Sequence, residues 1–221
     1  MKVSIVIPTL NEEKNIEILL NEIEKKDFVD EIIIVDGYSK DKTVEVTEKH
    51  GCKILYDDKG KGSALRKGLK EAKNDIVISM DADNSMLSDE LYLLIAGIQA
   101  GYDVCMGSRF IQGGGTEDMS LLRKFGNKFF VSLVNIFWKT NYSDLCYGYR
   151  SFKKSSIDKI GLKSDDFGIE TEISIKSAKL GLKVLEVPSF EKTRTYGDGK
   201  LRTFSDGITI LKTITNELFN R

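Results

Sequence analysis

The sequence is poor in several residue types, and each scarcity excludes a class of protein. Its 221 residues contain only 3 cysteines, Cys52, Cys105 and Cys146, and no CxxC pair. An odd number of widely spaced cysteines predicts neither a disulfide framework nor a thiolate metal site, and it fits a reducing cytoplasm. Only 2 prolines and a hydrophobic fraction of 41% exclude a disordered chain.

An excess of charge of one sign is also missing. The 33 basic side chains nearly balance 34 acidic ones, so no global field favours a nucleic-acid partner and any special electrostatics must be local. The longest apolar run, 129–138, is half of the about 20 residues that a membrane-spanning helix needs. The N-terminal apolar run ends at Pro8 and acidic residues follow, unlike a signal peptide. We therefore expect a cytoplasmic protein without a transmembrane helix.

Strand-like and helix-like segments alternate over the first part of the chain. Short apolar runs predict strands at 3–7, 31–35, 53–56 and 76–80, the first of them stopped by Pro8. Apolar residues at helical spacing separate these runs, and Asn11 is expected to cap the first helix. The alternation predicts an α/β fold with a mostly parallel sheet, in which ligands bind beyond the carboxyl ends of the strands. The expected helices are 12–23, 42–51 and 64–72.

The second half is less regular, and no linker or repeat marks a boundary, so we expect a single domain over residues 1–221. A polar, basic loop at 191–203 precedes the final helix. The expected strands are 103–106 and 183–187, and the expected helices are 120–139, 170–180 and 205–220.

The strongest local motif is Asp81-Ala82-Asp83, directly after a buried strand. Two carboxylates at this spacing can flank one point, and hard oxygen ligands suit Mg²⁺ or Mn²⁺ bridging phosphates. Alone, the motif is better explained by an Asp-rich turn. The loop Lys59-Gly60-Lys61-Gly62 adds lysines that can meet phosphate charge and glycines that allow close approach. Neither GxxxxGK[ST] nor GxGxxG is present, which disfavours a P-loop NTPase or a dinucleotide dehydrogenase.

Together these motifs resemble those of the family 2 inverting glycosyltransferases, which have the GT-A fold. The matching stretches are IPTLNEE at 7–13, VDGYSKDKT at 35–43, GKGSALRKG at 60–68 and DAD at 81–83. Beyond residue 100 the chain is similar to the dolichyl-phosphate mannose synthase branch. That likeness rests on GSRF at 107–110, the glycines at 113–115, DLCYGYRSF at 144–152, Glu170 with Glu172, and EVPSFEKTRTYGDGKLR at 186–202.

The resemblance implies a GT-A domain with a mostly parallel central sheet flanked by helices, a nucleotide-sugar-binding half at 1–106 and an acceptor-binding half at 107–221. It implies metal binding by Asp81 and Asp83, with Asp83 as the direct ligand. The implied nucleotide-sugar contacts are Pro8, Thr9, Asn11, Glu12, Asp36, Lys61, Gly62, Asp81 and Ala82. The implied acceptor-phosphate contacts are Arg109, Arg123, Arg194, Lys200 and Arg202, and the implied catalytic residues are Asp83, Arg109, Asp144, Arg194 and Lys200.

The implied reaction moves a hexose, mannose or glucose, from a GDP- or UDP-sugar to a polyprenyl phosphate, with inversion and a divalent metal. An alternative acceptor is a soluble hydroxyl, which would need a carboxylate base, Asp144 first and Glu172 second. Glu170 and Glu172 face different sides of a helix, so at most one should enter the site. A nucleotidyltransferase and a noncatalytic sugar-nucleotide-binding protein are further alternatives. The oligomeric state is left open.

The chain departs from the family pattern at three positions. Gly37 replaces a second acid after the second strand, Ser85 replaces a glutamine after the acidic motif, and Gly199 replaces a serine. Loss of the amide at 85 would leave more water on the metal. The identity of the donor nucleotide therefore stays open.

The segment 121–139 has four basic residues, no acid and two aromatic-rich stripes at helical spacing. One interpretation is a helix buried against the sheet. The other is a helix in the headgroup layer of a membrane, with Arg123, Lys124 and Lys128 on anionic lipid. The resemblance favours the second, because a polyprenyl phosphate must be reached at a membrane surface, and it implies a peripheral enzyme on the cytoplasmic membrane face.

Overall fold

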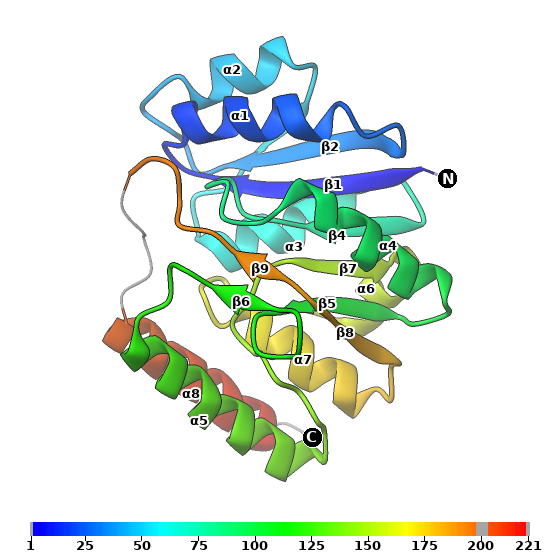
Figure 1. Cartoon of the computed structure of the whole chain (residues 1–221), viewed down its shortest axis with the longest axis vertical. Coiled ribbons are helices and arrows are strands. Elements are labelled where there is room, and N and C mark those ends of the chain that lie inside the picture. The colour runs from blue at the N-terminus through cyan, green and yellow to red at the C-terminus, as the bar shows by residue number, and fades with distance from the viewer. Residues whose placement is uncertain (1, 198–202, 220–221) are drawn as a thin grey trace.

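The computed structural model describes residues 2–197 and 203–219, and a 7-stranded sheet forms its centre (Figure 1). The strand order is β3-β2-β1-β4-β7-β5-β8. Every neighbouring pair is parallel except those made by β7, which runs antiparallel to β4 and β5. The prediction of a mostly parallel sheet is therefore confirmed. The strands are β1 (Val3–Thr9), β2 (Val29–Asp36), β3 (Lys53–Tyr56), β4 (Ile76–Ser79), β5 (Val104–Ser108), β7 (Arg150–Lys153) and β8 (Val184–Pro188).

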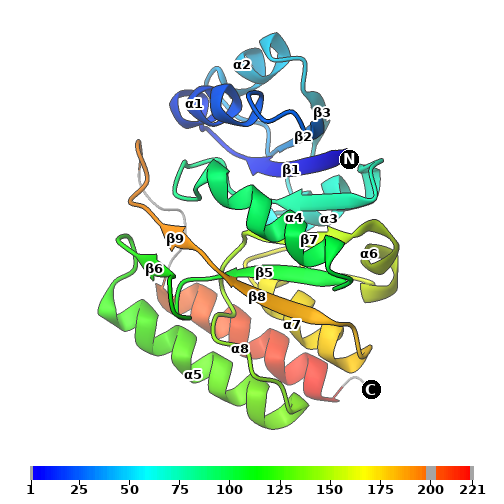
Figure 2. The ribbon, with the colours of Figure 1, turned by 45° about the vertical axis from the view of Figure 1, so that its right-hand side comes forward.

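Helices cover both faces of this sheet, because its strands alternate apolar side chains between two cores. In β1, Ile5 and Ile7 belong to the core under α1 and α4, whereas Val6 belongs to the core under α3 and the later helices. Figure 2 shows α1 and α4 on one side and α5, α7 and α8 together on the other. The helices are α1 (Glu13–Ile23), α2 (Thr43–Lys49), α3 (Lys61–Glu71), α4 (Leu91–Gln99), α5 (Leu121–Trp138), α6 (Lys154–Ile160), α7 (Ile169–Lys179) and α8 (Thr203–Phe219).

Two local predictions near the first strand are wrong. Pro8 lies inside β1, paired with Val35 of β2. The strand tolerates it because β4 pairs with β1 only as far as Val6, so the missing amide falls beyond that ladder. Asn11 does not cap α1: it has a left-handed backbone (φ 53°), and its side chain accepts a hydrogen bond from the amide of Lys40. The cap position is Glu12.

Several elements were not predicted. They include α4, whose sequence LYLLIAGIQ is apolar almost all round, and β7, a strand of only 4 residues. A second sheet of 2 strands pairs β6 (Gly115–Thr116) with β9 (Phe190–Glu191). This small sheet lies across the open end of the large one and brings the segment after β8 over the loop after β4 (Figure 1). The short helix η1 (Ser88–Glu90) and α6 complete the unpredicted elements.

Candidate active site

A cavity of about 480 Å³ lies beyond the carboxyl ends of β1, β4 and β5. At one end it is bounded by the loops after β1 and β3, as the parallel sheet predicts. At the other end it runs between the first halves of α5 and α8. Its wall carries acidic residues of the DAD motif and arginines from three separate segments, namely Arg109, Arg123 and Arg194.

The ammonium group of Lys61 forms ion pairs with both Asp81 and Glu170 on the cavity wall. Lys61 Nζ lies 2.8 Å from Asp81 Oδ1 and 3.1 Å from Glu170 Oε1. Burial acts to lower the pKa of Lys61, but the two carboxylates outweigh it and raise that pKa above its ordinary value. Burial and the nearby negative charge of Asp83 raise the pKa of Asp81, although Lys61 opposes them. This group carries one excess negative charge when all three side chains are ionised.

Asp83 is held from two sides. Oδ1 accepts hydrogen bonds from the amide and hydroxyl of Ser85, at 3.1 and 2.7 Å, and Oδ2 lies 2.7 Å from Arg194. Burial acts to raise the pKa of Asp83, but these bonds and the arginine charge lower it overall. Arg194 Nη1 also lies 3.9 Å from Glu12. Ser85, which replaces the family's glutamine, thus orients the carboxylate expected to hold the metal.

Arg109 is fixed by two carboxylates. Its Nε and Nη2 donate to Asp144 at 2.7 and 2.9 Å, and its Nη1 donates to Glu191 at 2.9 Å. The guanidinium also lies over the ring of Tyr147, 4.5 Å from its centre. Burial acts to lower the pKa of Arg109, but Asp144 and Glu191 raise it. The side chain is therefore a charged, rigid part of the cavity wall.

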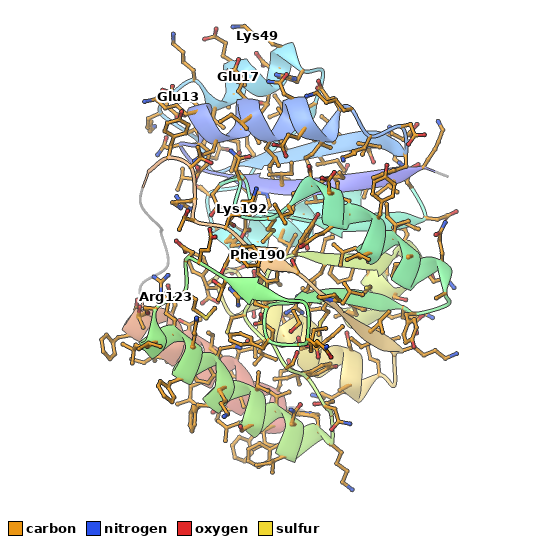
Figure 3. All side chains as sticks on the ribbon, in the orientation of Figure 1. Glu13, Glu17, Lys49, Arg123, Phe190 and Lys192 are labelled. Atoms are coloured by element: carbon orange, nitrogen blue, oxygen red, sulfur yellow. The ribbon has the colours of Figure 1, made fainter. Side chains whose placement is uncertain are left out.

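At its end between α5 and α8 the cavity is lined mostly by apolar residues, and charged side chains stand at its opening. Arg123 of α5 donates from Nε to Thr203 of α8 at 3.3 Å, so the first turns of these helices are joined. Figure 3 shows Arg123 at the end of the pair where both helices begin. Asp118 and Asp206 also line this rim. Deeper in, the lining is mostly apolar and comprises Leu122, Gly126, Phe130, Gly207 and Ile210.

Most of the predicted site residues meet in this one cavity. Those that line it are Pro8, Thr9, Glu12, Lys61, Asp81, Ala82, Asp83, Arg109, Arg123 and Arg194. Asn11, Asp36, Gly62 and Asp144 do not line it. Lys200 and Arg202, together with Gly199, lie outside the described residues.

Local contacts explain why Asp36, Gly62 and Asn11 do not line the cavity. Asp36 is fully buried, and its oxygens accept hydrogen bonds from the hydroxyl of Thr9 and from Ser39, which leaves Gly37 to face the cavity. Gly62 packs against backbone at 164–166. Asn11 is exposed on the loop after β1, where its side chain accepts a hydrogen bond from the amide of Lys40 in the loop after β2. These residues shape the loops that line the donor end.

Neither candidate for a general base offers a carboxylate to the cavity. Both oxygens of Asp144 accept from Arg109, and the side chain is buried behind it. Glu172 accepts from the amides of Lys163 and Ser164 and pairs with Lys176. Glu170, the other member of its pair, does line the cavity. The expectation that at most one of the two glutamates enters the site agrees with this placement.

Sequence reasoning missed the residues that complete the ion pairs. Glu191, which the sequence places in a polar loop, accepts hydrogen bonds from both Arg109 and the hydroxyl of Thr116. The pairing of Glu170 with Lys61 is likewise absent from the predictions. Cys146 and Phe167 also line the cavity, and burial raises the pKa of the Cys146 thiol to about 12. No sequence signal marks these pairings, because each joins segments far apart along the chain.

The acidic wall fits a divalent cation. The two groups described above, Asp81 with Glu170 around Lys61 and Glu12 with Asp83 around Arg194, each carry one excess negative charge when ionised. Mg²⁺ is commonly held by one or two carboxylates, with phosphate oxygens and water as the other ligands. In the part of the chain that the structure describes, no group of three or more acidic, histidine or cysteine side chains could hold a metal alone. Asp81 and Asp83 would therefore bind the ion together with a diphosphate.

The sequence profile described as Glycosyl transferase family 2 matches residues 4–161. The chain belongs to glycosyl transferase family 2. The resemblance inferred from the motifs is thereby confirmed. The fold agrees: glucosyl-3-phosphoglycerate synthase from Mycobacterium tuberculosis, solved with Mn²⁺, UDP and glucosyl-3-phosphoglycerate, superposes with a TM-score of 0.76 at 19% identity, covering 98% of this chain and 80% of that one.

Curated relatives include transferases named for lipid phosphates. Over 212 residues, 91% of this chain, the sequence is 34% identical to a dolichol-phosphate mannosyltransferase of Pyrococcus furiosus, of which it spans 60%. It is 29% identical over 213 residues to a dolichyl-phosphate hexose transferase of Haloferax volcanii, covering 96% of this chain and 91% of the relative. An undecaprenyl-phosphate mannosyltransferase of Micrococcus luteus is 26% identical over 214 residues, covering 91% of this chain and 88% of the relative.

Proposed function

We propose that this family 2 glycosyltransferase moves a hexose from a nucleoside-diphosphate sugar to a polyprenyl phosphate. One observation carries the proposal: a single cavity joins an acidic wall suited to a metal-bound diphosphate with an arginine-rimmed apolar end suited to a lipid phosphate. The names of the relatives from Pyrococcus, Haloferax and Micrococcus support the same acceptor class. Mannose and glucose are the candidate sugars, and GDP and UDP are the candidate carriers.

The donor would bind along the wall built by β1, α3 and β4. Asp81 and Asp83 would hold Mg²⁺ or Mn²⁺, which when bound supplies charge stabilisation to the departing diphosphate. Lys61 and Arg194 are the cations of this wall, and both lie within reach of the same carboxylates. Pro8, Thr9 and Gly37 line the region beyond them, where the nucleoside would extend.

The acceptor phosphate would bind between Arg109 and Arg123. In the transfer, the bond between the anomeric carbon and the β-phosphate oxygen breaks, and its electron pair leaves with the diphosphate. An anionic oxygen of the acceptor phosphate forms the new bond from the opposite side, which inverts the anomeric carbon. No proton has to be removed from that oxygen. This chemistry agrees with a cavity in which Asp144 serves to fix Arg109.

A membrane surface is the proposed location of the acceptor. One predicted stripe of α5, with Phe130 and Val134, packs into the core, while Phe125 is 70% exposed on the other. Among the residues described, no helix has the length and hydropathy to cross a bilayer. We therefore propose a peripheral enzyme at the cytoplasmic membrane face that docks through the apolar α5–α8 face. That face comprises Leu121, Leu122, Phe125, Phe129, Ile136, Phe137, Phe204, Ile208, Leu211 and Phe219.

The decisive test is transfer of label from a sugar nucleotide to lipid. The protein is incubated with Mn²⁺, labelled GDP-mannose or UDP-glucose, and dolichyl phosphate in detergent, and label is followed into the organic phase. We expect lipid-linked label that requires both the metal and the lipid phosphate. Transfer to a soluble saccharide without lipid, or no transfer from any donor, would contradict the proposal.

Membrane docking is tested separately by vesicle flotation with and without anionic lipid. We expect the protein to float, and Phe125→Ser with Phe129→Ser to reduce the floating fraction. Leu93→Ser is the control, because Leu93 is an exposed apolar residue of α4 on the opposite side of the sheet. Wild-type protein that stays wholly in the soluble fraction under both conditions would reject the peripheral location.

A further inference from the structure

Two helix-interior glycines have no packing reason to be glycine. Among the residues that the structure describes, a Cβ at Gly126 of α5 would meet no atom within 4 Å, and a Cβ at Gly207 of α8 would meet only Phe130, at 3.8 Å. Neither residue has the left-handed backbone that favours glycine. Glycine inside a helix is destabilising relative to alanine. The helices thus carry two unfavourable residues that neither backbone conformation nor crowding explains.

The other helix glycines of the described chain show the contrast. Gly68 of α3 lies directly against Val6, and Gly97 of α4 would place a Cβ 2.5 Å from the sulfur of Cys105. Gly62 would place a Cβ 2.6 Å from a backbone carbonyl oxygen. At these three sites glycine permits close packing. At Gly126 it leaves open space among the described residues, and at Gly207 a Cβ would make only ordinary van der Waals contact with Phe130.

Gly126 and Gly207 both line the active-site cavity, one on α5 and the other on α8. On α5 the lining residues Leu122, Gly126 and Phe130 are spaced by one helical turn, and on α8 Gly207 and Ile210 share one face. The two helices lie side by side and begin at the same end of the molecule (Figures 1 and 2). The missing side chains therefore widen one gap, between α5 and α8, at the apolar end of the cavity.

We propose that Gly126 and Gly207 form a passage for the first isoprene units of the acceptor's hydrocarbon chain. The inference rests on the proposed function and assigns the route by which the chain leaves the site. Arg123 stands at the rim of the passage, where a phosphate on the chain would find a guanidinium. The passage is continuous with the apolar α5–α8 face, since Leu122 belongs to both. A chain anchored at its phosphate can therefore remain in apolar surroundings from the cavity to the membrane.

The passage also suits an isoprenoid better than a sugar or a peptide. Leu122, Phe130 and Ile210 line it with apolar side chains, and the polar lining residue Asn127 is buried and accepts a hydrogen bond from the amide of Leu145 through its Oδ1. Burying a polar acceptor there would cost free energy, whereas each buried methylene of a hydrocarbon is favourable. Glycine on both helices leaves room for the methyl branches of the chain.

The test measures how affinity depends on the chain. Dissociation constants are measured by calorimetry for farnesyl phosphate and for ethyl phosphate, which share the phosphate but differ in hydrocarbon. Wild-type protein should bind farnesyl phosphate at least about tenfold more tightly. Gly126→Leu should remove most of that difference, Gly126→Ala should keep it, and affinity for UDP or GDP with Mn²⁺ should change less than about twofold in both.

Ser132→Leu is the matched control, because it adds the same side chain to an exposed site of α5 that does not line the cavity. It should leave both dissociation constants at their wild-type values. Gly207→Leu should fill the same passage from the α8 side, so the conclusion does not depend on one variant. Unchanged farnesyl phosphate binding in Gly126→Leu and Gly207→Leu overturns the passage while leaving the proposed function standing. Wild-type protein that binds farnesyl and ethyl phosphate equally, or neither, overturns the passage, and failure to bind either also rejects the lipid acceptor.

Discussion

The guanidinium of Arg194 lies 2.7 Å from Oδ2 of Asp83, the carboxylate expected to hold the metal. Both side chains are mostly shielded from solvent, with 18% and 17% of their surfaces exposed, so the contact is an appreciable charge interaction. Arg194 reaches Asp83 because the segment after β9 runs back over the loop after β4, where the amide of Lys192 donates to the carbonyl of Ser85. A divalent cation bound at Asp83, as proposed, would therefore compete with Arg194 for this carboxylate.

This competition predicts the effect of Arg194→Gln. In the absence of donor, the variant should bind Mn²⁺ about three- to tenfold more tightly, because no arginine has to leave Asp83. Its transfer rate should nevertheless fall, because the cation is lost from the cavity wall. Titration calorimetry measures the first effect. Arg66→Gln, at a surface ion pair with Asp165, is the control and should bind Mn²⁺ as wild type does. Unchanged Mn²⁺ affinity in Arg194→Gln would mean that the metal does not use Asp83.

The acidic motif itself is tested by Asp83→Ala. Without the carboxylate the metal loses its direct protein ligand, and we expect metal-dependent turnover to fall by about a thousandfold or more. Asp89→Ala is the matched control: Asp89 is also an aspartate after β4, but it is exposed and paired with Lys26. It should keep near-normal turnover. Near-normal turnover in Asp83→Ala, measured over a range of Mn²⁺ concentrations, would defeat the metal assignment.

The donor side of the site could be predicted from the sequence, because its charged residues stand in short motifs that follow predicted strands. Asp81 and Asp83 follow one strand, and the loop containing Lys61 follows another, so the rule that parallel strands end at one edge brings them together. Asp36 also follows a strand, but it does not line the cavity, and its contact with the nucleotide stays a prediction. Its position after β2 was correct, but its oxygens are taken by Thr9 and Ser39, a pairing that depends on loop geometry.

The acceptor side could not be assembled from the sequence. Arg109 follows β5, yet its partners Asp144 and Glu191 come from a loop before β7 and from β9. The antiparallel insertion of β7 between β4 and β5 has no sequence signal, because RSFK is short and lacks strand-like alternation. The packing of α5 could not be predicted either: Phe130, Leu133 and Val134 pack into the core, whereas Phe125 and Phe129 are exposed. Its membrane interpretation stays a prediction.

The contact between Asp144 and Arg109 predicts strongly non-additive mutations. If Asp144 acts by fixing Arg109, Asp144→Asn should raise the acceptor KM, and in an Arg109→Ala background it should have little further effect. The coupling energy from kcat/KM should then be about 1–3 kcal/mol. Circular dichroism checks that each variant is folded. Additive losses, with a basic limb missing from the pH profile of Asp144→Asn, would instead indicate that Asp144 is a general base.

The two kinds of helix glycine predict opposite effects of the same substitution on stability. At Gly126 the added methyl meets open space and restricts the unfolded chain, so Gly126→Ala should raise the free energy of unfolding by about 0.5–1 kcal/mol. At Gly97 the methyl would overlap Cys105, so Gly97→Ala should lower that free energy by about 1–3 kcal/mol. Denaturant unfolding of both variants beside wild type measures the difference. If Gly126→Ala proves as destabilising as Gly97→Ala, the space beside α5 is filled in the folded protein, and a passage there loses its structural basis.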